Sequence, residues 1–204
     1  MLDVRKLQQR LGVEVDGALG PGTFAALFAA SGAAPPVAAE LGLAANVHFR
    51  SYRILANGLR LAHFLAQCAH ESGGFRHARE VWGPTAAQRA YEGSAKLGND
   101  RPGDGKRYLG RGPGQLTGRA NYRLYGRKLG IDLERHPELL EAWSLGLLAF
   151  CAYWDACGLN AWADRDDLRV VSNGINRGDP LSAKEPNGWA DRQARHAAMK
   201  ALIL

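Results

Sequence analysis

The sequence predicts a mainly α-helical protein with two lobes arranged around one central helix. Residues 59–72 are apolar on nearly every side, which is typical of a helix that other elements enclose. Elsewhere the apolar residues recur every three or four positions, and the alternating pattern of strands is absent from the sequence. The hydrophobic fraction is 46% of 204 residues, which is enough for one ordinary domain with a small appendage.

The chain begins with two short predicted helices. Apolar side chains from Val4 to Leu11 have helical spacing, and Asp3 is placed to cap this first helix. A turn-rich connector leads to a second helix, expected over residues 21–30. Their apolar residues are too few for an independent core, so the pair must dock on the rest of the chain or remain loosely attached.

A linker is predicted over residues 31–36, because Pro35, Pro36 and the small residues before them end helices. We therefore divide the chain into a small helical segment over 1–34 and a main domain over 35–204. Only the second part is long enough to enclose a core of its own.

Beyond the linker, helices alternate with glycine-rich turns. The central helix is expected to end at Gly73-Gly74, since paired glycines stop a helix. Residues 92–105 predict a surface loop at the border of a cleft, and residues 106–112 a small extended arm. Thr117 is placed to cap a helix that reaches about Leu129. The other helices are expected over 84–91, 137–142, 144–157, 166–172 and 187–203.

The chain is basic, with 26 Lys and Arg against 20 Asp and Glu, a net charge of +6 and a pI near 9.5. A basic surface favours an anionic partner, such as an acidic polymer or a weakly contacted anionic envelope. The positive charges are spread along the chain and match no nucleic-acid-binding motif, so we expect no nucleic acid partner.

Membrane, metal and cofactor classes receive little support from the sequence. No apolar run approaches the length of about 18 residues that a membrane helix requires, and no signal-peptide region is found, so we expect synthesis in the cytoplasm. Cys68, Cys151 and Cys157 have neither a disulfide-framework nor a CxxC pattern. His63, His70 and His77 recur every seven residues, but two glycines interrupt the helix and the pattern His-Glu-x-x-His is incomplete. We therefore expect no metal and no cofactor.

Two glutamates on either side of a double glycine form the most informative pattern. Glu71 lies in His70-Glu71-Ser72-Gly73-Gly74-Phe75, and Glu80 follows nine residues later. Cleavage of a glycosidic bond needs one acid to protonate the leaving oxygen and a second carboxylate to activate water or attack the sugar. Separate placement on a helix end and a facing loop suits an inverting reaction, in which the carboxyl groups lie about 6.5–9.5 Å apart.

The surroundings of the two carboxyl groups can also be anticipated. The acid must carry a proton near neutral pH, so we expect apolar neighbours around Glu71. The base must stay ionised, so we expect an arginine beside Glu80, and the candidates are Arg79, Arg111 and Arg192. The simpler alternative for Glu80 is a surface ion pair with a neighbouring arginine. Aromatic candidates for stacking on sugar rings are Trp82, Tyr91, Tyr108 and Tyr122.

A glycine-rich polar segment comes next, Gly110-Arg111-Gly112-Pro113-Gly114-Gln115-Leu116-Thr117-Gly118-Arg119-Ala120-Asn121-Tyr122. A phosphate-binding loop is excluded, because no Gly-Lys-Ser/Thr follows and no strand precedes. With the glutamate motif, this segment resembles glycoside hydrolase family 19, which comprises chitinases and related phage endolysins. The resemblance covers roughly residues 36–204 and implies a lysozyme-like fold with a substrate cleft and a small extended arm.

The resemblance also implies roles for individual residues. Glu71 would be the general acid, Glu80 the general base, and Thr117 would help to hold the attacking water. Arg192 would support the acidic network at the substrate. The residues implied or considered as sugar contacts are Gln115, Asn121, Tyr122 and Asn176. Three places depart from the family pattern, namely Gly114, Arg177 and the segment after Glu80.

The first segment resembles a small peptidoglycan-binding helical repeat, on Leu7-Gln8-Gln9-Arg10-Leu11-Gly12 and on Val15-Asp16-Gly17-Ala18-Leu19-Gly20-Pro21-Gly22-Thr23. Together the resemblances imply a monomeric endolysin that binds peptidoglycan polysaccharide and reaches the wall after the membrane is permeabilised. A chitinase is the close alternative. A lytic transglycosylase, which needs one carboxylate, and a wall-binding module without catalysis are further alternatives.

Overall fold

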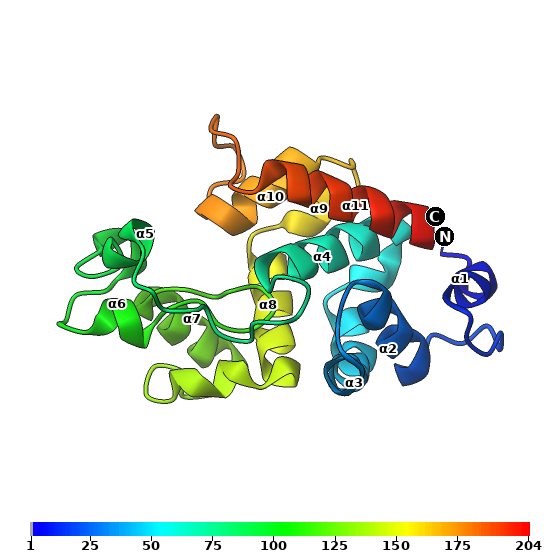
Figure 1. The fold of residues 1–204 in the computed structure, drawn as a ribbon, viewed down its shortest axis with the longest axis horizontal. Coiled ribbons are helices and arrows are strands. Elements are labelled where there is room, and N and C mark those ends of the chain that lie inside the picture. Colours follow the sequence, from blue (N-terminus) through cyan, green and yellow to red (C-terminus); the bar gives the residue numbers. More distant parts are fainter. Residues whose placement is uncertain (1) are drawn as a thin grey trace.

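The computed structural model describes residues 2–204 and confirms the mainly helical fold class. In Figure 1, α5, α6 and α7 lie at one end of the molecule and α1–α3 at the other, with α4 and α8 between them. The helices are α1 (Val4–Leu11), α2 (Pro21–Ala30), α3 (Pro35–Ser51), η1 (Ile54–Ala56), α4 (Gly58–Glu71), α5 (Ala86–Arg89), η2 (Ala95–Leu97), α6 (Asp104–Arg107), α7 (Arg119–Leu129), η3 (Pro137–Glu141), α8 (Trp143–Ala156), α9 (Leu159–Ala163), α10 (Leu168–Arg177) and α11 (Trp189–Ile203).

Two hydrophobic clusters define the two lobes. The larger cluster joins α1–α4 to α8–α11, and the predicted central helix α4 contributes buried side chains from most of its surface. The smaller cluster surrounds Tyr108, Tyr122 and Tyr125. Helix α8 belongs to both, because Phe150 packs in the larger cluster while Ala149 packs in the smaller one. This helix therefore forms the wall that the lobes share.

The N-terminal segment, described from residue 2 onward, docks on the larger lobe. Helix α2 packs along α3, and Phe24 and Phe28 are fully buried. The ring of Phe28 lies 5.4 Å from that of Phe75, directly after the glutamate motif, in an edge-to-face contact. Docking is thus the observed alternative, and a separate wall-binding role of this segment stays a prediction.

Three local predictions were wrong for identifiable reasons. Helix α3 begins at Pro35, inside the predicted linker, because proline is well suited to the first turn of a helix. The expected arm over 106–112 is partly the short helix α6, and its strand-like pairing in the described chain is limited to isolated bridges of Arg111 with Arg79 and Leu116. Gly118 rather than Thr117 caps α7, since the Thr117 hydroxyl donates instead to the carbonyl of Gln115.

The helices of the described chain were compared with the length and apolar character of a membrane-spanning helix. Within residues 2–204, no helix combines the length and the apolar character that a bilayer crossing requires.

Candidate active site

Glu71 is the last residue of the central helix α4. Its side chain is 16% exposed, and its Oε1 accepts a hydrogen bond of 2.5 Å from Nη2 of Arg192. Arg192 is itself buried and also donates to the carbonyl of Asn187 at 2.9 Å and to the side chain of Gln67. The surroundings of Glu71 are therefore not apolar alone, because the buried guanidinium of Arg192 holds its carboxyl group in place.

Glu80 lies on the loop after α4 and is held by neutral donors. Its Oε1 accepts from Nε2 of Gln88 at 3.0 Å and from the hydroxyl of Tyr91 at 3.4 Å. Its Oε2 accepts from the backbone N–H of Gly110 at 3.2 Å. Burial, and then the nearby Glu80 carboxylate, raise the pKa of Tyr91 to about 12, so the phenol keeps its proton and remains a donor.

The arginines expected beside Glu80 have other partners. Arg111 pairs with Glu141 at 2.9 Å, and Arg79 lies 3.7 Å from the same carboxylate. Arg192 pairs with Glu71 instead. The prediction was wrong because residues close in sequence on an irregular loop need not point toward the same side. The hydrogen bonds from Gln88 and Gly110 take the place of the expected cation.

Both glutamates line one cleft with a volume of about 890 Å³. The larger lobe contributes the end of α4, residues of α8 and the end of α10. The smaller lobe contributes the loops around α5 and η2, the glycine-rich segment and the first turns of α7. Two carboxyl groups from separate elements that face one cleft are the arrangement that cleavage of a glycosidic bond requires.

Four of the predicted polar residues line this cleft, namely Gln115, Thr117, Asn121 and Asn176. The Thr117 hydroxyl donates to the carbonyl of Gln115, and Asn121 Nδ2 donates to the carbonyl of Thr117 at 2.8 Å. Gln115 has a left-handed backbone, with φ of 49°, and its amide Nε2 donates to the carbonyl of Gly112 at 2.9 Å. These contacts fix the side chains before any sugar arrives. Their sugar-binding roles stay predictions.

Tyr122 and Arg192 do not reach the cleft surface. Tyr122 is fully buried, its hydroxyl donates to the carbonyl of Leu109 at 2.8 Å, and Arg111 donates to that hydroxyl. Direct contact of Tyr122 with a sugar is therefore a wrong prediction, because the ring packs inside the hydrophobic cluster of the smaller lobe. Arg192 is 1% exposed and acts on the site through Glu71. Among the other aromatic candidates, Tyr108 is buried and only Tyr91 lines the cleft.

Four cleft residues with charged or phenolic side chains were not among the predicted contacts, namely Lys96, Tyr125, Tyr153 and Arg177. Tyr125 follows Asn121 by four positions on α7, so its place on the same helix face was accessible from the sequence. Lys96 Nζ donates to the carbonyl of Arg177 at 2.8 Å, which joins the loop of one lobe to α10 of the other. No local pattern indicates that long-range contact.

The glycine-rich segment owes its composition to close packing on α8. A Cβ added at Gly112 would lie 2.8 Å from Cα of Gly146, and one added at Gly114 would lie 2.0 Å from the ring of Phe150. Both separations are well inside van der Waals contact, so the absence of side chains lets this loop lie directly against the shared helix. Gly114, which departs from the family pattern, is thus complemented by Phe150.

We expect Gly114→Leu to destabilise the protein by about 1–3 kcal/mol, because the new side chain must displace the core ring of Phe150. In a chain of this length the melting temperature Tm should fall by about 2–4 °C per kcal/mol. Gly22→Ala is the matched control, because Gly22 lies in α2 with open space around it and should be neutral or slightly stabilising. An unchanged Tm for Gly114→Leu would contradict the packing argument.

We expect Gln88→Leu to lower kcat by roughly tenfold while KM changes less, because Gln88 positions Glu80 without lining the cleft. Gln88 is 3% exposed, and its Oε1 also accepts from the backbone N–H of Gly83 and Thr85, so Tm should be measured beside the kinetics. A second test variant is Gln88→Glu, which keeps the acceptor but places a second carboxylate against Glu80 and should also lower kcat. Full activity of both variants would rule out a positioning role.

With this geometry in view, two comparisons identify the family. The family model described as "Chitinase class I" matches residues 43–155. A Haemophilus influenzae protein described as a "Glycosyl hydrolase family 19 domain-containing protein" is 34% identical over 152 residues, which cover 60% of this chain and 72% of that protein. The helical fold and the paired carboxylates in a cleft are those of a glycosidase. The chain belongs to glycoside hydrolase family 19.

A plant protein agrees with this membership, and a solved structure agrees in fold. An Arabidopsis thaliana endochitinase is 29% identical over 161 residues, which cover 79% of this chain and 50% of the plant protein. Chitinase C from Streptomyces griseus has a similar fold, with a TM-score of 0.58 at 23% identity over 76% of this chain and 66% of that chain. This chain therefore spans most of the Haemophilus protein but about half of the plant enzyme.

Proposed function

We propose that the protein hydrolyses β-1,4 glycosidic bonds of bacterial peptidoglycan by an inverting mechanism. The observation that carries the proposal is the cleft in which Glu71 and Glu80 are each held by a separate hydrogen-bond network. Family membership supports glycosidase chemistry. The substrate and the roles of the individual residues are proposals, which the digestion and mutation experiment below tests.

In this mechanism Glu71 protonates the oxygen of the leaving sugar. Glu80 removes a proton from a water molecule, and the oxygen of that water attacks the anomeric carbon from the opposite face. Arg192 fixes the orientation of Glu71, while Gln88, Tyr91 and Gly110 fix that of Glu80. Thr117 lines the same cleft, and its hydroxyl oxygen can accept a hydrogen bond from the water. Preorganised groups of this kind lower the cost of reaching the transition state.

Charge supports peptidoglycan as the substrate. Its peptide stems carry carboxylates, whereas a polymer of N-acetylglucosamine is neutral. Lys96 and Arg177 line the cleft that contains the two glutamates, and the chain as a whole has a net charge of +6. A docked N-terminal segment that resembles a wall-binding repeat adds to this preference. In this proposal the enzyme is a cytoplasmically made, monomeric endolysin that reaches the wall after the membrane is permeabilised.

Chitin is the second candidate, and the relatives favour it. The Arabidopsis thaliana relative is named an endochitinase, and a structure of similar fold is chitinase C from Streptomyces griseus. Both polymers contain β-1,4-linked N-acetylated sugars, so one cleft architecture suits either. The decision between them rests on contacts outside the two carboxylates, where Arg177 and Gly114 differ from the family pattern.

The deciding experiment is digestion of purified peptidoglycan and of chitin, in parallel, by the wild type and by Glu71→Gln and Glu80→Gln. Products are reduced and the new chain ends are identified by mass spectrometry. New reduced sugar ends from peptidoglycan that disappear in both variants are the expected result. Reduced muramic ends indicate a muramidase, and reduced glucosamine ends indicate hydrolysis of the other glycosidic bond of the alternating backbone.

The remaining outcomes overturn the proposal in distinguishable ways. Anhydromuramic ends that survive Glu80→Gln indicate a lytic transglycosylase, because that reaction needs only one carboxylate. Cleavage of chitin alone establishes the chitinase candidate. Binding of wall fragments without new ends from either polymer indicates a binding module.

A further inference from the structure

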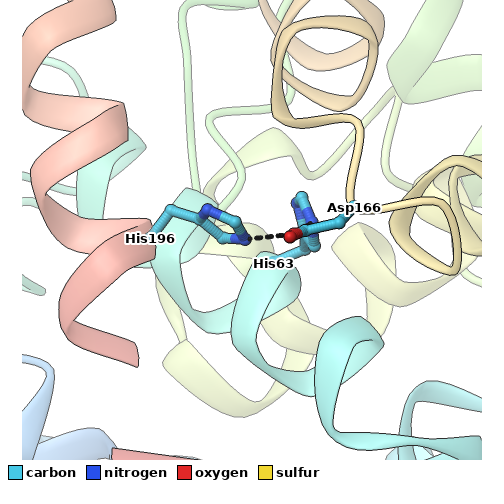
Figure 2. Close-up of side chains that lie close together, drawn as sticks. All are labelled: His63, Asp166 and His196. Atoms are coloured by element: carbon cyan, nitrogen blue, oxygen red, sulfur yellow. Dashed lines mark hydrogen bonds and ion pairs between the residues drawn. The ribbon is translucent and has the colours of Figure 1, made fainter. Parts of the chain in front are cut away.

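A cluster of two imidazoles and one carboxylate lies apart from the cleft. His63 comes from α4, Asp166 from the turn before α10, and His196 from α11. Figure 2 shows the three side chains converging from these separate elements, and one nitrogen or oxygen atom from each lies within 4.8 Å of the others. None of the three residues lines the cleft that contains Glu71 and Glu80.

The distances suit coordination of one cation. Asp166 Oδ1 lies 3.0 Å from His63 Nε2 and 3.3 Å from His196 Nε2. The two imidazole ring centres are 3.9 Å apart, with the planes inclined at 43°. Metal–ligand bonds of about 2.0–2.2 Å in a tetrahedral site place the ligand atoms roughly 3.3–3.6 Å from one another. The three donor atoms are therefore close enough to reach one ion once the two closely packed rings move apart.

Hydrogen bonding alone leaves His196 unexplained. Its side chain is 9% exposed, and within residues 2–204 its Nε2 has no hydrogen-bond partner. Asp166 Oδ1 is near enough for an ion pair, yet the direction at the ring nitrogen does not meet hydrogen-bond geometry. Buried polar atoms are normally paired, so an unpaired ring nitrogen beside a carboxylate points to a ligand that both atoms can share. His63 Nδ1, the ring nitrogen that faces away from Asp166, also has no hydrogen-bond partner within residues 2–204. An ion bound at His63 Nε2 would leave Nδ1 unchanged.

We propose that His63, Asp166 and His196 form a binding site for a divalent cation of the zinc class. Two imidazole nitrogens and one carboxylate oxygen are donors that Zn²⁺ prefers, whereas Mg²⁺ and Ca²⁺ prefer oxygen alone. The Asp166 side chain is 33% exposed, so water has access to a fourth position. Three protein ligands with one open position form a recognised zinc geometry.

Lys200 is the cation that neutralises this cluster in the metal-free protein. Its ammonium group contacts Asp166 Oδ2, the carboxylate oxygen that faces away from the contacts with His63 and His196. The Lys200 side chain is 34% exposed and long enough to turn toward solvent. Lys200 and a metal ion therefore compete electrostatically for one carboxylate, and removal of the lysine charge should tighten metal binding.

The position of the cluster gives an ion a structural consequence. His63 precedes Glu71 by two turns on α4, and Arg192 precedes His196 by one turn on α11. An ion bound between His63 and His196 therefore ties together the two helices whose Arg192–Glu71 contact holds the proposed acid. Binding should stabilise the folded chain, because the unfolded chain does not assemble these three ligands.

The test uses the full chain after treatment with a chelator. Calorimetric titration with ZnCl₂ should give one ion per chain, and Co²⁺ should show the visible absorption of a tetrahedral site. At a Zn²⁺ concentration 100-fold above Kd, Tm should rise by about 5–10 °C. The test variant is His196→Gln. The controls are Cys157→Ser, which removes the partly buried thiol, and His136→Gln, which removes an exposed histidine.

Loss of at least tenfold in Zn²⁺ affinity in His196→Gln, with both controls unchanged, is the expected result. Lys200→Gln should bind Zn²⁺ more tightly than the wild type, and it decides the question if His196→Gln does not fold. Absence of binding to the wild type overturns the proposal. Equal affinity in His196→Gln, loss of binding in Cys157→Ser, or unchanged affinity in Lys200→Gln also overturns it.

Discussion

Replacement of Glu71 by glutamine should lower kcat by about 10²–10⁴-fold while the protein stays folded. Loss of a general acid removes a contribution of that size, and glutamine cannot protonate the leaving oxygen. Glutamine has the same shape and keeps an oxygen that accepts from Arg192 Nη2, so the buried guanidinium retains a partner. The measurement is initial rate against the polymer that the digestion experiment selects, with Tm recorded for each variant.

A matched control separates loss of chemistry from loss of charge. Glu138 is an exposed glutamate of η3, with its side chain 60% exposed, and it lies outside the cleft lining. Glu138→Gln removes one negative charge, as Glu71→Gln does, and should leave kcat within about twofold because surface charges are screened. If Glu71→Gln kept more than a tenth of the wild-type kcat, Glu71 would not be the acid.

The sequence predicted the central helix and its end at Glu71 because local rules determine both. An apolar run followed by two glycines indicates a buried helix and its end, and α4 does end at Glu71. The predicted helix over 21–30 agrees with α2, since Pro21 favours a first turn. The prediction of a linker over 31–36 was wrong, although it also rested on proline, because Pro35 begins a helix. Proline marks a boundary, and whether a helix begins or ends there depends on the residues after it.

The partners of the two glutamates were beyond local reasoning. Arg192 is 121 residues from Glu71 in the sequence, and only the packing of α11 against α4 brings them together. The burial of Tyr122 depends on the packing of the hydrophobic cluster of the smaller lobe, which residues close in sequence do not determine. The cluster around Asp166 joins residues from three elements that are distant in sequence, so no local sequence pattern indicates that His63 and His196 lie together.

Removal of the Asp104 carboxylate should have the largest effect on stability among the changes considered. Asp104 is 2% exposed and accepts two hydrogen bonds from Arg119, through Nη2 and through Nε at 2.8 Å. Arg119 also donates to Glu134 at 3.1 Å and lies 4.9 Å over the ring of Tyr108. These contacts join α6 and α7 in the smaller lobe. Asp104→Ala leaves a buried guanidinium without its main partner, which costs about 3–5 kcal/mol.

The same network predicts how stability depends on pH. Hydrogen bonds from Arg123, and also from Arg119, lower the pKa of Glu134 to about 2, and a hydrogen bond from Arg119 lowers the pKa of Asp104. A carboxylate whose pKa is lower in the folded state stabilises that state above its unfolded pKa. This stabilisation is lost as the pH falls from about 4.5 toward 2. Glu134→Gln should flatten the fall of Tm over that range, and an unchanged slope would contradict this assignment.

The decisive comparison for Asp104 is with a double replacement. Asp104→Ala should lower Tm by about 6–20 °C, from a cost of about 3–5 kcal/mol in a chain of this length. Asp104→Leu combined with Arg119→Met removes both buried charges and should recover much of that loss, because the cost comes from leaving one charge unpaired. The exposed pair of Arg135 and Asp132, 3.6 Å apart, supplies the control, and Asp132→Asn should change Tm by less than about 2 °C. If the double variant is as unstable as Asp104→Ala, the pair itself, rather than avoidance of an unpaired charge, stabilises the smaller lobe.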